Sequence, residues 1–218
     1  MAEAHPSPGH GPIGFTVAAA DFYEDLEDDN SKSYWTAHKD DYEALVRRPM
    51  LALTDALADE FGAAKVFRPY RDVRFAADKT PYKTHQGAFV GTAPSTGYYV
   101  QIDASGIRVG AGWYEASPER KHRFRQAVDD ARKGAALQRI LDGAERGGFE
   151  VGGDTVKTQP RGWSADHPRI DLLRHNTLTL MRWYGTPDWM STPTLATRVA
   201  ADWRALTPLL DWHAKHVA

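Results

Sequence analysis

The sequence predicts an α+β protein, with a largely antiparallel sheet of about five strands packed with N-terminal, middle and C-terminal helices. Three observations predict this class. Apolar residues recur at helical spacing before residue 62, alternate at strand spacing between residues 65 and 114, and then return to helical spacing. Helices and strands that are grouped along the chain in this way are typical of an α+β fold rather than a parallel doubly wound sheet.

The N-terminal part predicts three helices. Helical spacing of aromatic and aliphatic residues begins near residue 15. Asn30 or Ser31 can cap a second helix, because a short polar side chain accepts a hydrogen bond from a free N–H of the first turn. Pro49 suits the first turn of a third helix, and Gly62 suits the position just after its end.

Four strands are expected in the central part. Residues 65–75, KVFRPYRDVRF, alternate like a strand, and Pro69 inside them points to an edge position, a bulge or a break. Residues 83–91 read as the second strand. Residues 98–103 and 107–114 predict a hairpin, in which Tyr98, Val100 and Ile102 share one face.

The C-terminal part predicts further helices and two short strands. Ser117 and Pro118 suit the cap and first turn of a helix. The expected elements are a helix to about residue 133, a helix over 135–146, a strand over 149–151, a short helix over 168–175, a strand over 177–183 and a helix from residue 192. Pro208 is expected to kink or restart the last helix.

Composition narrows the class of protein. We expect residues 1–13 to be a disordered lead-in and residues 14–218 to form a single domain. The absence of cysteine excludes disulfides, a thiolate nucleophile and cysteine-ligated metal sites. No stretch is apolar enough for a membrane span, and the first residues lack the pattern of a signal peptide, which predicts a soluble cytoplasmic protein without membrane partners.

Three segments carry a resemblance to a known family. They read YRDVRFAADKTPYKTH at residues 70–85, NSKSYWTAHKDDY at residues 30–42 and QPRGWSADHPRIDLLRH at residues 159–175. Together they resemble the bacterial and fungal family called domain of unknown function 2461. The resemblance implies a single α+β domain, and it supplies no activity, cofactor or catalytic residue.

The segment before and within the second strand is the strongest candidate for a ligand site. Guanidinium forks bind carboxylate and phosphate through paired hydrogen bonds, and His85 is the obvious group that titrates near neutral pH. In this hypothesis Arg74 and Lys83 hold a small anion, and His85 is the candidate for catalysis. The full predicted ligand set is Arg71, Asp72, Arg74, Tyr82, Lys83 and His85. The alternative is that Arg71, Asp72 and Arg74 form a buried ion-pair network that fixes the sheet against its helices.

Two other hypotheses concern different parts of the chain. His167, Asp171 and His175 lie four residues apart, which gives a weak candidate for a metal-dependent enzyme, but helix capping explains the same residues. The second is a non-enzymatic module that binds a protein or nucleic acid through its aromatic surface or through a basic helix with Arg120, Lys121, Arg123 and Arg125. The net charge of −2 argues against nucleic acid. The sequence identifies no cofactor, and it leaves open whether the protein is an enzyme.

Overall fold

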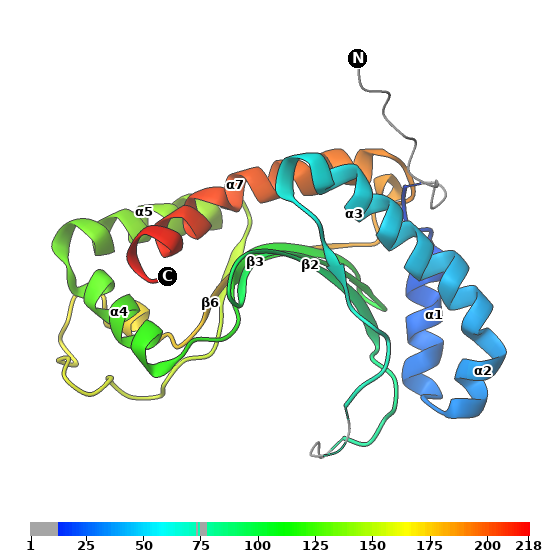
Figure 1. The fold of residues 1–218 in the computed structure, drawn as a ribbon, viewed down its shortest axis with the longest axis horizontal. Helices are drawn as coiled ribbons and strands as arrows, with labels where there is room; N and C mark the ends of the chain where they lie inside the picture. The colour runs from blue at the N-terminus through cyan, green and yellow to red at the C-terminus, as the bar shows by residue number, and fades with distance from the viewer. Residues whose placement is uncertain (1–12, 73, 75–77) are drawn as a thin grey trace. The chain divides into compact units, whose positions relative to one another are not determined.

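The α+β class is confirmed by the structure, a computed structural model that describes residues 13–72, 74 and 78–218 (Figure 1). Its sheet has six strands in the order β1-β2-β3-β4-β6-β5, against an expectation of about five. The strands are β1 (Lys65–Val66), β2 (His85–Ala93), β3 (Thr96–Asp103), β4 (Gly106–Trp113), β5 (Glu150–Gly152) and β6 (Leu178–Gly185). The helices are α1 (Val17–Asp28), α2 (Lys32–Asp41), η1 (Tyr42–Arg47), α3 (Arg48–Phe61), α4 (Pro118–Asp129), α5 (Ala131–Arg146), α6 (Ile170–Leu173), η2 (Asp188–Ser191) and α7 (Thr194–His216).

The contacts of the chain divide it into two compact units. The first unit comprises Met1–Val90, Val100–Arg108 and Trp183–Ala200, and the second comprises Gly91–Tyr99, Val109–Arg182 and Ala201–Ala218. The expected lead-in at residues 1–13 falls almost entirely outside the described residues. The expectation of a single domain stays a prediction.

In the first unit, α2 and α3 begin and end close to the capping residues that the sequence predicts. The Ser31 hydroxyl accepts a hydrogen bond from the Tyr34 N–H at 3.1 Å, which caps α2. Pro49 lies in the first turn of α3. Gly62 ends that helix with a φ of 96°, a backbone conformation that glycine adopts at little cost. The inward-facing side chains of these helices are buried, among them Phe22, Leu26, Trp35, Tyr42, Val46, Leu53 and Leu57.

The segment before β2 is less regular than its alternation predicts. Among the residues of this segment that the structure describes, only Lys65 and Val66 form a strand, antiparallel to β2, with Lys65 opposite Phe89. An isolated bridge then joins Tyr70 to Tyr82. Pro69 lies between these two pairings and has no N–H for a sheet hydrogen bond, so the prediction of one strand over residues 65–75 was wrong in extent. Residues 73 and 75 of that prediction lie outside the described residues.

In the second unit, helices α4 and α5 meet earlier than predicted. The Asp130 carboxylate accepts hydrogen bonds from the Arg132 and Lys133 N–H groups, each at 2.9 Å. This cap begins α5 at Ala131 rather than near residue 135 and ends α4 at Asp129 rather than near residue 133. Helix α7 continues through Pro208 to His216 as one helix. Within the described residues, no helix is long and apolar enough to cross a membrane.

Candidate functional site

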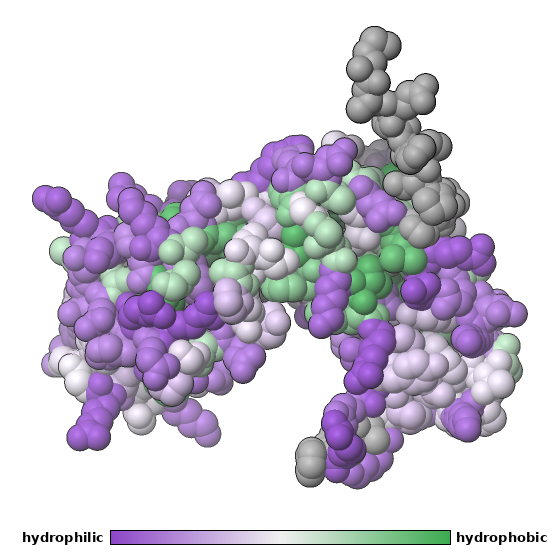
Figure 2. Space-filling model, viewed as in Figure 1, coloured by the Kyte–Doolittle hydropathy of each residue, from purple (hydrophilic) through white to green (hydrophobic). Residues whose placement is uncertain are grey.

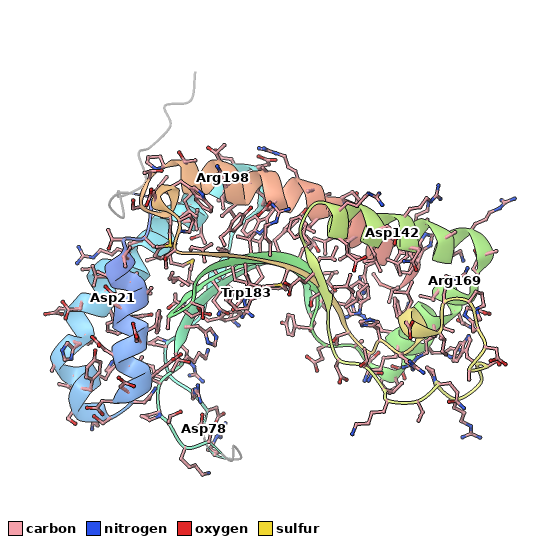
Figure 3. All side chains as sticks on the ribbon, turned by 180° about the vertical axis from the view of Figure 1, so that it is seen from behind. Asp21, Asp78, Asp142, Arg169, Trp183 and Arg198 are labelled. Atoms are coloured by element: carbon pink, nitrogen blue, oxygen red, sulfur yellow. The ribbon has the colours of Figure 1, made fainter. Side chains whose placement is uncertain are left out.

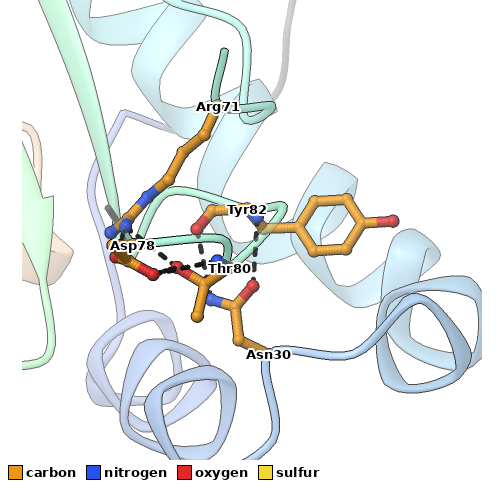
Figure 4. A network of polar contacts seen from close by, with 5 residues as sticks. All are labelled: Asn30, Arg71, Asp78, Thr80 and Tyr82. Atoms are coloured by element: carbon orange, nitrogen blue, oxygen red, sulfur yellow. Dashed lines mark hydrogen bonds and ion pairs between the residues drawn. The ribbon is translucent and has the colours of Figure 1, made fainter. Parts of the chain in front are cut away.

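Arg71 is the residue of the predicted ligand set that organises the loop before β2 (Figure 4). Its guanidinium forms an ion pair with Asp78 and donates a hydrogen bond to the Thr80 hydroxyl at 2.9 Å. Asp78 in turn accepts from the Thr80 N–H at 2.9 Å and from the Thr80 hydroxyl at 2.8 Å. These hydrogen bonds from Thr80, more than Arg71, lower the pKa of the Asp78 carboxyl. These contacts join Arg71 to Asp78 and Thr80.

Tyr82 is buried and helps to anchor the end of that loop. The Asn30 side chain donates to the Tyr82 carbonyl at 3.1 Å and accepts from the Tyr82 N–H at 3.0 Å, as a neighbouring strand would (Figure 4). The Tyr82 ring stacks on the buried Trp35 ring with 4.3 Å between centroids. The Tyr82 side chain therefore has a packing role. The hydrogen bonds of its main chain fix the position of the next residue, Lys83.

We predict that Asn30→Ala lowers the free energy of unfolding by about 1–2 kcal/mol, because the two main-chain groups of Tyr82 lose their partner. Asn30→Asp keeps the acceptor and loses the donor, so we expect a smaller loss. Urea unfolding measures both, and amide exchange of Tyr82 is expected to accelerate in Asn30→Ala. Equal stability of all three proteins would show that Asn30 does not anchor the loop.

Asp72 and Arg74 form a local pair at the surface. The Arg74 guanidinium donates to the two Asp72 oxygens at 2.9 and 2.6 Å. The Arg74 side chain is 76% exposed and that of Asp72 is 47% exposed. The hydrogen bonds from Arg74 lower the pKa of the Asp72 carboxyl. The expected buried network of Arg71, Asp72 and Arg74 is therefore not present: Arg71 binds Asp78, and the pair of Asp72 and Arg74 is exposed.

Lys83 and His85 lie with aromatic and basic side chains from neighbouring strands of the first unit. We call this group the sheet-face cluster. It consists of Lys65, Phe67, Lys83, His85, Gln101, Asp103, Arg108 and Trp183. Lys65 Nζ and Lys83 Nζ lie 5.7 and 5.4 Å from the centroid of the Phe67 ring. The adjacent β2 residues Gln86 and Ala88 point to the opposite, buried face, where Gln86 accepts a 2.6 Å hydrogen bond from the Tyr42 hydroxyl.

Burial and like charge destabilise the protonated forms of two members of the cluster. The pKa of Lys83 is lowered first by burial and then by Arg68, Lys65 and Arg71. The pKa of His85 is lowered first by burial and then by Lys83 and Arg108, while Asp103 raises it. His85 is therefore mainly neutral at pH 7. The two side chains lie where positive charge is in excess.

Arg108 connects the two sides of the cluster. Its guanidinium donates a hydrogen bond to Oε1 of the Gln101 side chain and lies 4.4 Å from the centroid of the Trp183 ring. Gln101 donates to Asp103 at 2.5 Å, and Asp103 also accepts from the Ser105 N–H at 2.8 Å. Trp183 keeps 44% of its surface exposed. Figure 3 labels Trp183 in β6 and Asp78 in the loop before β2.

The structure brings together only part of the predicted ligand set. Lys83 and His85 lie in the cluster, and Arg71 acts electrostatically on both. Asp72 and Arg74 bind each other, and Tyr82 packs on Trp35. The set predicted from the sequence does not include Lys65, Phe67, Gln101, Asp103, Arg108 and Trp183. Alternation placed Tyr98, Val100 and Ile102 on one face of their strand, so Gln101 and Asp103 could have been found on the other.

A scan against protein families matches residues 18–212 to the family described as conserved hypothetical protein, domain of unknown function 2461. The chain belongs to this family. The match covers most of the chain and confirms the resemblance that the three sequence segments carried. A search of the curated proteins finds no match for it.

In this family member, His167, Asp171 and His175 bind other groups. The His167 ring lies 3.1 Å from an Asp129 oxygen and accepts a hydrogen bond from the Arg169 N–H at 3.0 Å. His175 donates to the Thr177 carbonyl at 3.0 Å, and Asp171 pairs with Arg174. Across the part of the chain that the structure describes, no three His, Cys, Asp or Glu residues are close enough to hold a metal ion.

The basic helix α4 uses several of its arginines within the second unit. Arg120 donates to the Pro94 carbonyl at 2.8 Å, Arg123 to the Ala218 carbonyl at 3.0 Å and Arg125 to the Leu173 carbonyl at 3.0 Å. These contacts tie α4 to three other segments. They give the arginines a structural role and weaken the hypothesis that α4 binds nucleic acid.

The second unit also has a groove of about 610 Å³ between α5 and α7. Figure 2 shows one face of the molecule, where hydrophobic residues lie among hydrophilic ones over the helices of the second unit. The lining residues are Ala136, Arg139, Ile140, Gly143, Ala144, Gly147, Phe149, Arg182, Ala201, Asp202, Ala205 and Pro208. At this groove Arg182 binds Asp202 at 2.7 Å and lies 4.0 Å from the centroid of the Phe149 ring.

Proposed function

We propose that the protein binds a small anionic ligand, a phosphate or carboxylate, on the sheet-face cluster of the first unit. The observation that carries the proposal is the excess of positive charge around Lys83 and His85. Burial and the neighbouring Arg68, Lys65 and Arg71 lower the pKa of Lys83. An anion bound among these cationic side chains would reduce their mutual repulsion. It would also replace the hydration that the Lys83 ammonium loses through burial.

The donors of the cluster suit such a ligand. Lys83 offers an ammonium group, His85 offers an imidazole, and Arg108 offers a guanidinium that Gln101 and Trp183 already orient. An oriented side chain loses less conformational entropy on binding than a mobile one. Arg71 contributes charge from the adjoining loop. Arg74 is not part of the proposed anion site, because its guanidinium binds Asp72.

Inorganic phosphate is the first probe, with the melting temperature and calorimetric titration as readouts. We expect a dose-dependent rise in melting temperature, since a ligand that binds only the folded state stabilises it. In Lys83→Gln we expect phosphate affinity to fall at least tenfold. Lys39→Gln removes an exposed lysine of α2 in the same unit and is expected to leave the affinity unchanged.

Proton uptake provides an independent readout. Because the pKa of His85 is lowered in the ligand-free protein, a bound anion is expected to raise it, so that the protein takes up protons when the anion binds. Titrations in buffers of different ionisation enthalpy measure that uptake. Phosphate binding of equal strength in Lys83→Gln and Lys39→Gln would show that the anion binds elsewhere. No binding of phosphate or of a small carboxylate would reject the proposal.

A further inference from the structure

The sheet-face cluster combines its cations with aromatic rings, and this suggests more than a bare phosphate site. Phe67 lies with Lys65 and Lys83 at one side of the cluster, and Trp183 lies with Arg108 at the other. Trp183 is a large apolar side chain that stays 44% exposed. An exposed indole beside oriented charge is a surface on which a planar ring can stack.

The strand order separates the two sides. His85 belongs to β2 and Trp183 to β6, and β3 and β4 lie between them. Neighbouring strands are about 4.8 Å apart, so three spacings amount to roughly 14 Å. A single phosphate cannot contact both sides. A longer ligand, with an anion at one end and a ring at the other, can.

Arg108 lies in β4, between the strands of His85 and Trp183, and it interacts with both residues. Its charge lowers the pKa of His85, and its guanidinium lies against Trp183. The Asp103 carboxylate beside it accepts hydrogen bonds from Gln101 and from the Ser105 N–H. Those hydrogen bonds reduce the repulsion that Asp103 would exert on an incoming anion.

Building on the anion site proposed above, we infer that the ligand is an anion that carries a planar ring, the chemistry of a nucleoside monophosphate. The ring stacks on the exposed Trp183 indole, and the phosphate lies at Lys83 and His85. Arg108 contacts the middle of the ligand. The net charge of −2 fits a small ligand better than a nucleic-acid strand.

Three probes separate the two ends of the ligand: adenosine 5′-monophosphate, ribose 5-phosphate and adenosine, each titrated calorimetrically. We expect the nucleotide to bind at least tenfold tighter than ribose 5-phosphate and than adenosine. In Trp183→Leu the nucleotide is expected to lose its advantage over ribose 5-phosphate, whose own affinity changes far less because only the orientation of Arg108 is affected. Trp189→Leu is the matched control, because Trp189 also carries a stacked arginine, Arg198 at 4.7 Å.

A second measurement does not depend on a variant being well folded. In protein labelled with 5-fluorotryptophan, the ¹⁹F resonance of Trp183 is expected to shift with the nucleotide and not with ribose 5-phosphate. Equal affinity for the nucleotide and ribose 5-phosphate would overturn this inference and leave the anion site standing. Adenosine that binds as tightly as the nucleotide would also overturn it. If neither phosphate compound binds, this inference is overturned, and the anion site fails as well only if inorganic phosphate and a small carboxylate also do not bind.

Discussion

Asp202→Ala is expected to lower the free energy of unfolding by about 3 kcal/mol, because it leaves Arg182 without its carboxylate in a partly buried site. The Asp202 side chain is only 6% exposed, and it accepts from Arg182 at 2.7 Å. Breaking a buried ion pair costs about 3–5 kcal/mol, and the 21% exposure of the Arg182 side chain argues for the lower end of that range. Urea unfolding followed by circular dichroism measures the change.

Asp211→Ala is the matched control, since Asp211 is an exposed aspartate of the same helix. We expect that variant to stay within about 0.5 kcal/mol of the parent protein. The double variant Asp202→Leu with Arg182→Met removes both charges, so we expect it to recover much of the loss. If Asp202→Ala costs no more than Asp211→Ala, the ion pair does not stabilise the second unit.

The helices of the first unit could be predicted closely because their boundaries depend on local chemistry. Ser31 caps α2 through a hydrogen bond to a residue three positions later, and Gly62 ends α3 in a left-handed conformation. At Asp130 the same local chemistry gave a wrong predicted boundary. The Asp130 carboxylate can cap α5 only if α4 ends before it. The spacing of apolar residues does not show where α4 ends.

The candidate site could be predicted only in part, because strands far apart in sequence build it. The dense polar segment before β2 pointed to Lys83 and His85. Arg108 and Trp183 come together because β4 pairs with β6, although β4 ends at Trp113 and β6 begins only at Leu178. The segment itself was misread as one strand. The ligand set predicted from it included both Arg71 and Arg74, whereas in the structure these two arginines bind different carboxylates.

Acid is expected to destabilise the protein through His213, which is 1% exposed and lies 4.4 Å from the Trp113 ring. Within the described residues, its Nδ1 has no hydrogen-bond partner. Burial, and then Arg120 and Arg123, lower the pKa of His213 from its ordinary value of 6.5 to about 4. Between pH 6.5 and pH 4 the unfolded chain binds a proton that the folded protein does not. Stability is therefore full above pH 6.5 and is lost as the pH falls toward 4, by about 3 kcal/mol in total.

His213→Leu isolates this effect, because leucine fills the buried position and does not titrate. His85 and His175 also have lowered pKa values, so part of the acid sensitivity stays in the variant. The measurement is the free energy of unfolding in urea at pH 8 and pH 4.5, and the quantity of interest is the difference between parent and variant. We expect the parent to lose about 2–3 kcal/mol more than His213→Leu over that range. His122→Leu changes an exposed histidine of α4 and is expected to behave like the parent. Equal losses in the parent and in His213→Leu would mean that His213 accepts its proton in the folded protein as readily as in the unfolded chain.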